Sequence, residues 1–243
     1  MDIKVPNPLA RRHPDVDEAQ GSAGPVGGVR AWFFVSFWGL PSGPVGWVGA
    51  RLLPLVAGRF YRLVAEELAL QPDDELLEVG CGSGGLLALA TQPRHVAGLD
   101  ASGIQLGLAR GRLADRLAAG TAELVLGDAM ALPWDDDRFS AVACVNTLKF
   151  VPDPARALRE IVRVLRPGGR ALVVIDPPPK DPAQSGAYDA FGERLWTAED
   201  AEALMAGAGF AEVTVTQLPA KQLRMQLLRG VKASAAQPPG QRT

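Results

Sequence analysis

The chain has 243 residues, a formal net charge of −2 and 47% apolar residues, which suits one large α/β domain better than two small ones. Its 25 basic residues are scattered rather than gathered into a patch or stripe, and this argues against a nucleic-acid partner. The two cysteines form no C-x-x-C pair and the chain has only two histidines, so we expect neither a disulfide framework nor a metal site.

The first part of the chain divides by composition. Residues 1–28 are polar and rich in glycine and proline, so we expect poor order there. Residues 29–58 are apolar, and the uncharged run 31–50 has the length of a membrane span, but its prolines and glycines argue against a lone spanning helix. We expect a cytoplasmic protein in which residues 29–58 form a hydrophobic helical lid, or equally a helix packed on the core. Peripheral contact with a membrane stays open.

From residue 59 onward, apolar strand patterns alternate with amphipathic helix patterns. The helix patterns cover residues 59–70, 84–91, 102–119, 154–165 and 198–208, and the strand patterns cover 75–79, 95–99, 122–126, 139–145, 171–175, 213–218 and 223–228. Such alternation predicts a parallel sheet with helices on both faces. We therefore predict one domain over residues 59–232, a doubly wound, Rossmann-like sheet of seven mostly parallel strands, followed by a disordered tail at 233–243.

A glycine-rich turn follows the first strand. Residues 76–85 read L-L-E-V-G-C-G-S-G-G, with the acid Glu78 two positions before the first of Gly80, Gly82 and Gly84. Residues without a Cβ let the backbone turn tightly and approach a ligand closely. The spacing is G-x-G-x-G, whereas a dinucleotide fingerprint reads G-x-G-x-x-G.

Three further motifs follow later strands. Asp100 ends the second strand in G-L-D-A-S, where a carboxylate can accept hydrogen bonds from a ribose diol. Residues 127–134 read G-D-A-M-A-L-P-W after the third strand, and residues 139–154 run through the fourth strand and its exit. The next helix ends in R-V-L-R-P-G-G, at residues 163–169.

Together these motifs resemble class I S-adenosylmethionine-dependent methyltransferases, and R-V-L-R-P-G-G is typical of the ubiquinone/menaquinone-biosynthesis type (methyltransferase type 11). The resemblance implies the cofactor S-adenosyl-L-methionine, with its methionine part in the glycine loop, its ribose on Asp100, and its adenine on Asp128 and the amide of Ala129. The cofactor-binding residues that we predict are Glu78, Gly80, Cys81, Gly82, Gly84, Asp100, Ala101, Gln105, Asp128, Ala129, Met130 and Asn146.

Methyl transfer from a sulfonium is an in-line displacement, so the protein mainly aligns the acceptor and excludes water. A base is needed only where the acceptor must lose a proton. We consider three residues as candidate catalytic groups: Tyr61 before the first strand, Asn146 beside the methyl donor, and Asp176 after the fifth strand. Ordinary packing is the alternative for Tyr61. We interpret Lys149 as a solvated lysine.

Aromatic residues gather in one N-terminal segment, at Trp32, Phe33, Phe34, Phe37, Trp38 and Trp47. Such residues suit a hydrophobic small-molecule acceptor, such as a natural product, a quinone or a lipid-like molecule. Three alternatives remain open. The first is a cofactor-binding protein of this fold that catalyses another reaction, the second is a peripheral membrane methyltransferase acting on lipids or quinones, and the third is an NAD-binding oxidoreductase. The sequence does not predict the oligomeric state.

Overall fold

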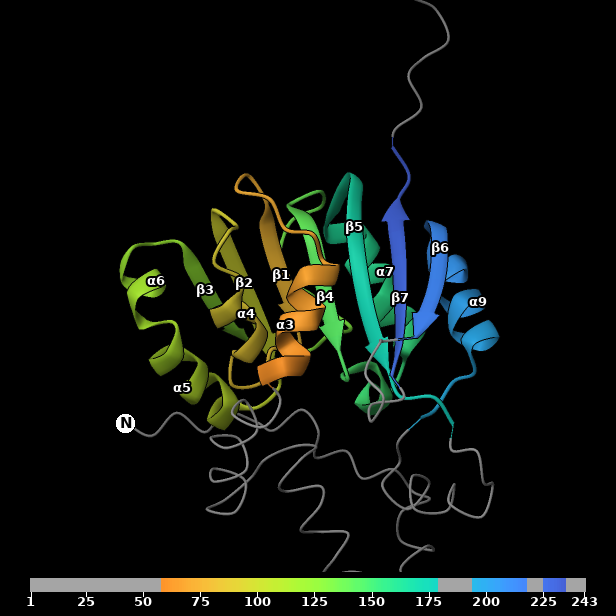
Figure 1. Cartoon of the computed structure of the whole chain (residues 1–243), viewed down its shortest axis with the longest axis horizontal. Coiled ribbons are helices and arrows are strands. Elements are labelled where there is room, and N and C mark those ends of the chain that lie inside the picture. Colours follow the sequence, from red (N-terminus) through yellow and green to blue (C-terminus); the bar gives the residue numbers. More distant parts are fainter. Residues whose placement is uncertain (1–57, 179–193, 218–224, 235–243) are drawn as a thin grey trace, which may run out of the picture.

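The structure is a computed structural model that describes residues 58–178, 194–217 and 225–234 (Figure 1). The predicted tails at 1–28 and 233–243 and the predicted lid at 29–58 lie wholly or mostly outside these ranges. The predicted boundary of the catalytic domain, 59–232, therefore stays a prediction.

A sheet of seven strands forms the centre of the molecule (Figure 1). The strands are β1 (Glu75–Val79), β2 (His95–Asp100), β3 (Ala122–Leu126), β4 (Phe139–Val145), β5 (Leu165–Ile175), β6 (Phe210–Gln217) and β7 (Gln226–Lys232). Their order is β3-β2-β1-β4-β5-β7-β6, and only β7 runs antiparallel to its neighbours. The predicted seven-stranded, mostly parallel, Rossmann-like sheet is confirmed.

Helices cover both faces of this sheet (Figure 1). They are α3 (Gly58–Glu67), α4 (Gly85–Leu89), α5 (Gly103–Arg112), α6 (Ala114–Ala118), α7 (Pro154–Val164) and α9 (Ala198–Ala208), with a 3-10 turn, η4 (Leu148–Phe150). Helices α3, α4 and α5 pack on one face, whereas α7 and α9 pack on the other. From β1 the chain adds β2 and β3 on one side, and from β4 it adds the later strands on the other side. The strand order therefore reverses between β1 and β4. Ligands bind at such a switch point, beyond the carboxyl ends of the strands.

Helix α7 shows how the local sequence sets these elements. Pro154 occupies its first turn and the Asp153 side chain accepts a hydrogen bond from the Arg156 amide at 2.9 Å, which caps the helix. Four apolar side chains at helical spacing, from Ala157 to Val164, are buried against the sheet. The helix therefore begins and ends within one residue of the predicted range.

Several predicted boundaries are wrong. The helix predicted over 59–70 ends at Glu67, and the strands predicted over 213–218 and 223–228 span Phe210–Gln217 and Gln226–Lys232. The helix expected over 102–119 is interrupted at Leu113, and Gly107 and Gly111, which have low helix propensity, precede the break. Strand β5 begins at Leu165 rather than at 171, so Pro167-Gly168-Gly169 lies inside the strand. The pairing of β4 with β5 shifts between Phe139 and Ala141, and this irregularity accommodates the extra residues.

Candidate active site

The carboxyl ends of β1 and β2 are tied together by the glycine turn. The amides of Gly80 and Cys81 donate to the Leu99 carbonyl at 2.7 and 3.0 Å. One oxygen of Asp100 accepts from the Gly82 amide at 2.7 Å and the other from the Ser102 amide at 2.8 Å. Asp100 thus holds the turn against the start of α5, a structural role that the sequence did not indicate.

Gly80 cannot carry a side chain in this turn. Its φ is +75°, and a Cβ placed on it would lie 2.1 Å from Oγ1 of Thr147. Thr147 follows β4, and its hydroxyl also approaches the Gly80 carbonyl at 3.5 Å. The exit of β4 therefore packs directly on the glycine turn.

Glu78 is a buried acid on the strand that leads into the turn. Glu78 is only 2% exposed, and its Oε2 has no hydrogen-bond partner among the described residues. Burial raises the pKa of this carboxyl well above its ordinary value, the charge of Asp100 raises it further, and the Leu87 amide partly offsets both. Burial likewise raises the pKa of Asp100, although the Ser102 and Gly82 amides lower it.

Two amide side chains leave further oxygens without partners near the turn. Gln105 is buried on α5, and its amide group lies 3.9 Å from the position of a Cβ on Gly82. Asn146 follows β4 with φ +54°, which is unusual for a residue other than glycine. Neither Oε1 of Gln105 nor Oδ1 of Asn146 has a hydrogen-bond partner in the described ranges. Buried oxygens of this kind call for an explanation, and a ligand is one.

The segment after β3 lies next to Asp100, since the Gly127 amide donates to the Asp100 carbonyl at 3.1 Å. Asp128 is exposed, and its Oδ1 accepts from the Met130 amide at 2.8 Å. Ala129 is buried and Met130 is half-buried. The predicted nucleoside residues therefore lie at the ends of neighbouring strands, with Ala101 exposed directly after Asp100.

Tyr61 and Cys81 lie on the α4 side of Glu78. The Tyr61 ring packs on Gly85, where a Cβ would meet it at 2.7 Å. Burial raises the pKa of the Tyr61 hydroxyl, and the charge of Glu78 raises it further. Burial also raises the pKa of the Cys81 thiol. Tyr61 therefore stays protonated at neutral pH, which suits a hydrogen-bond donor better than a base.

Asp176, the third candidate catalytic residue, is ion-paired. Its Oδ2 lies 2.7 Å from Nζ of Lys149, and the two side chains are 26% and 15% exposed. The interpretation of Lys149 as a solvated lysine is wrong, because η4 turns its side chain toward the end of β5. The only sequence signal for this ion pair was that Lys149 follows β4 and Asp176 follows β5, two strands that pair in the sheet.

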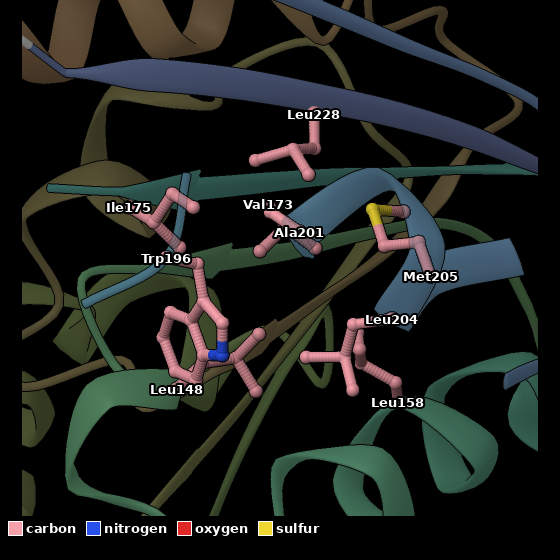
Figure 2. A pocket seen from close by; sticks show the side chains of 9 residues that line it. All are labelled: Leu148, Leu158, Val173, Ile175, Trp196, Ala201, Leu204, Met205 and Leu228. Carbon is pink, nitrogen blue, oxygen red and sulfur yellow. The ribbon is translucent and has the colours of Figure 1, made fainter. Parts of the chain in front are cut away.

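Gln226 is a further polar residue that sequence reasoning missed. It begins β7 opposite Ile175, is buried, and has an Oε1 without a partner in the part of the chain that is described. A small apolar pocket of about 10 Å³ lies close by, between the sheet and α9 (Figure 2). Its lining is formed by Leu148, Leu158, Val173, Ile175, Trp196, Ala201, Leu204, Met205 and Leu228.

The fold and the glycine-turn site define a Rossmann-like methyltransferase domain, and comparison with known proteins agrees. The family model described as a methyltransferase domain matches residues 77–173. The O-methyltransferase cnsE of Penicillium expansum is 30% identical over 194 residues, which cover 77% of this chain and 68% of the relative. The chain therefore belongs to the methyltransferase family.

A second relative shares a shorter region. The ubiquinone/menaquinone biosynthesis C-methyltransferase UbiE of Pseudomonas putida (strain GB-1) is 34% identical over 134 residues, which cover 54% of this chain and 52% of the relative. The chain thus matches about half the length of that protein.

Solved structures share the fold. A putative O-methyltransferase from Nostoc punctiforme PCC 73102 aligns with a TM-score of 0.66 and 19% identity, covering 85% of this chain and 68% of that one. The [4+2]-cyclase SpnF aligns with a TM-score of 0.61 and 24% identity, covering 74% and 83%. Among the described residues, no helix combines the length and apolar content that a membrane crossing needs.

Proposed function

We propose that this chain binds S-adenosyl-L-methionine at the carboxyl ends of β1, β2 and β3 and transfers its methyl group to a small hydrophobic acceptor. The observation that carries the proposal is the set of buried oxygens around the glycine turn. Glu78, Gln105 and Asn146 each present one oxygen that no described residue satisfies. Unmet buried acceptors are costly, so a ligand with several donors would stabilise this arrangement.

The residues fit the chemistry of the cofactor at each end. The cofactor carries an ammonium group, a sulfonium, a ribose diol and an adenine amino group. Glu78 offers a carboxyl for the positive end of the ligand. Each oxygen of Asp100 accepts one backbone amide and keeps acceptor capacity for a ribose hydroxyl. Asp128 is exposed and offers its Oδ2 to the adenine amino group, with the Ala129 amide and Met130 beside it.

When bound, the cofactor supplies a methyl group already activated by the neighbouring positive sulfur. The remaining task of the chain is to orient the acceptor and exclude water. Asn146 and Tyr61 flank the glycine turn from β4 and α3, and we assign both to this positioning. The hydrophobic acceptor is supported by the aromatic residues within 29–58, which lie outside the described residues, and by a quinone-biosynthesis relative.

The experiment is a methyl-transfer assay with the full chain, labelled S-adenosylmethionine and a panel of hydrophobic phenols, quinols and amines. The expected result is a product 14 Da heavier with equimolar S-adenosylhomocysteine. Uptake of the cofactor without methylated product would favour a different reaction on the same fold. Co-sedimentation with vesicles separates a peripheral membrane enzyme from one that acts on acceptors in solution.

A further inference from the structure

The ion pair of Lys149 and Asp176 joins the exits of β4, the central strand, and its neighbour β5. Strands β4 and β5 are parallel neighbours, with Val145 opposite Val174, and the Asn146 amide donates to the Val174 carbonyl at 2.9 Å. Lys149 lies one turn beyond Asn146, and Asp176 directly follows β5. The pair therefore lies near Asn146, at the same carboxyl end of the sheet as the glycine turn but on the opposite side of β4 from β1.

Stability alone gives little reason for this pair. Both side chains are largely covered, so each loses hydration, and such pairs are frequently no more stabilising than apolar residues of similar size. The pair also leaves one oxygen of Asp176 available. Nζ of Lys149 donates a hydrogen bond to Oδ2 of Asp176, whereas Oδ1 accepts none from the described residues. The Asp176 side chain is 26% exposed. A ligand can thus reach a carboxylate that is held in one orientation.

Apolar side chains flank the pair. Leu148 precedes Lys149 and Ile175 precedes Asp176, and both line the apolar pocket with Trp196 (Figure 2). The amide of Arg194 donates to the Lys149 carbonyl at 3.3 Å, which brings the segment before α9 to the same place. The pocket, at about 10 Å³, is too small for a ring. An aromatic acceptor therefore has to lie outside it, at the exposed side of the Asp176 carboxylate.

We propose that Asp176 accepts the proton of a hydroxyl group on an aromatic acceptor, and that Lys149 positions Asp176 for this step. The inference rests on the proposed function. A lone pair on the acceptor oxygen forms the new C–O bond as the C–S bond of the cofactor breaks, and that bond's electrons stay on sulfur. The O–H proton moves to Oδ1 of Asp176 and then to solvent. The products are an aryl methyl ether, S-adenosylhomocysteine and one proton.

The test compares two acceptors of the same shape, 2-naphthol and 2-naphthalenethiol. In mildly alkaline buffer the thiol is largely ionised and needs no base, whereas the naphthol keeps its proton. We expect Asp176→Asn to lower kcat for 2-naphthol about 100-fold, the lower end of what a general base contributes. Its kcat for 2-naphthalenethiol should change less than about threefold by the same reasoning.

Lys149 variants test the positioning role. Lys149→Met should lower kcat for 2-naphthol about 10-fold with little change in KM, and Lys149→Arg should restore most of it, because a residue that only orients a base contributes less than the base itself. The matched control is Lys232→Met, which breaks another lysine–aspartate pair, with Asp137 at 2.6 Å, at the opposite edge of the sheet. Thermal melts of every variant verify folding.

The outcomes separate the two proposals. Equal losses for the naphthol and the thiol in Asp176→Asn, or transfer by the unmodified chain to the thiol alone or to neither probe, would overturn the proton-acceptor role. A titration with S-adenosylmethionine is run in parallel on every protein. Failure of the unmodified chain to bind the cofactor would instead overturn the proposed function.

Discussion

Two glutamates on one strand show how differently the two ends of the sheet are built. Glu75 and Glu78 lie three residues apart on β1, and both are buried, with exposed fractions of 7% and 2%. Glu75, at the amino end, forms ion pairs with the guanidinium groups of Arg94, Arg138 and Arg166. Glu78, at the carboxyl end, has an oxygen with no hydrogen-bond partner among the described residues.

The contrast extends across the sheet. At the amino ends, Asp74 accepts hydrogen bonds from Arg170 and from Ser140, the latter at 2.6 Å. At the carboxyl ends, the oxygens of Gln105, Asn146 and Gln226 have no hydrogen-bond partner within the described ranges. Two buried atoms at the amino end, Nδ1 of His95 and Oε2 of Glu75, also have no hydrogen-bond partner among the described residues. Oε2 of Glu75 nevertheless forms the ion pair with Arg138, whereas Oε2 of Glu78 forms none with those residues. The comparison teaches that ion pairs and hydrogen bonds join most charged groups at one edge of the sheet. The other edge leaves several oxygens without partners among the described residues, as the proposed ligand site requires.

The largest expected effect is at Asp100. Asp100→Ala removes a carboxylate that holds the glycine turn and that we propose binds the ribose, so two charge-assisted hydrogen bonds to the ligand would be lost. At roughly 1.5 kcal/mol each, this weakens S-adenosylmethionine binding by about 100-fold. Calorimetric titration measures the change, and Asp115→Ala on α6 is the control. A dissociation constant within threefold of the unmodified chain would place the nucleoside elsewhere.

The next effect is on the turn itself. Gly80→Ala introduces a Cβ at φ +75° that meets Thr147, so we expect the free energy of unfolding to fall by about 2 kcal/mol or more. Gly107→Ala is the matched control on α5, where a Cβ meets nothing within 4 Å, and it should stabilise the helix by roughly 0.5–1 kcal/mol. Denaturant unfolding curves distinguish the two. Equal behaviour of the variants would mean that the turn is not constrained by β4.

Glu75→Gln tests the amino end of the comparison. The change leaves three guanidinium groups without their shared carboxylate. Because the arginine side chains are 35–56% exposed, water screens these ion pairs, and we expect the free energy of unfolding to fall by only about 2 kcal/mol. Cofactor affinity should not change, because the residue lies at the other end of β1. A large loss of affinity at unchanged stability would reverse the roles that we assign to the two ends.

Glu78→Gln tests the carboxyl end and has the smallest expected effect on stability. Burial raises the pKa of Glu78 in the folded chain, so the folded state holds this proton to higher pH than the unfolded state does. The stability that Glu78 contributes is present at acid pH and is lost as pH rises through its folded pKa. An uncharged glutamine avoids that loss, so the ligand-free variant should melt at a higher temperature than the unmodified chain at neutral pH, and the difference should vanish at acid pH.

The same variant should bind S-adenosylmethionine more weakly, because it lacks the carboxyl that we propose binds the positive end of the ligand. A lower melting temperature of ligand-free Glu78→Gln at neutral pH would show that Glu78 has a structural partner after all. Together, Glu75→Gln and Glu78→Gln form a matched pair. Glu75→Gln should reduce stability without weakening binding, and Glu78→Gln should weaken binding without reducing stability.

The sequence predicted most of the fold because burial on both faces of a parallel sheet leaves apolar runs that are easy to recognise. The ranges of β1, β3 and β4 match the predicted strands to the residue, and so does α9, whose Thr197 side chain caps it at 3.1 Å from the Asp200 amide. The start of β5 was missed because Pro-Gly-Gly normally ends an element, and here it forms an irregularity within one.

The candidate site was predictable only where a motif carries it. The glycine turn, Asp100 and Asp128 belong to recognisable sequence motifs. The surroundings of Lys149 and Gln226 depend instead on which strands become neighbours. Lys149 and Asp176 are 27 residues apart in sequence and meet only because β4 lies beside β5. Gln226 gave no signal, since a glutamine at a strand start is usually exposed.

An equilibrium titration of the full chain with S-adenosylmethionine, repeated with S-adenosylhomocysteine and with NAD, tests the central claim most directly. We predict one molecule of either adenosyl ligand bound per chain, in competition with each other, and no uptake of NAD. No uptake of either adenosyl ligand, or saturable binding of NAD in their place, would contradict the account of a sheet edge built to hold this cofactor.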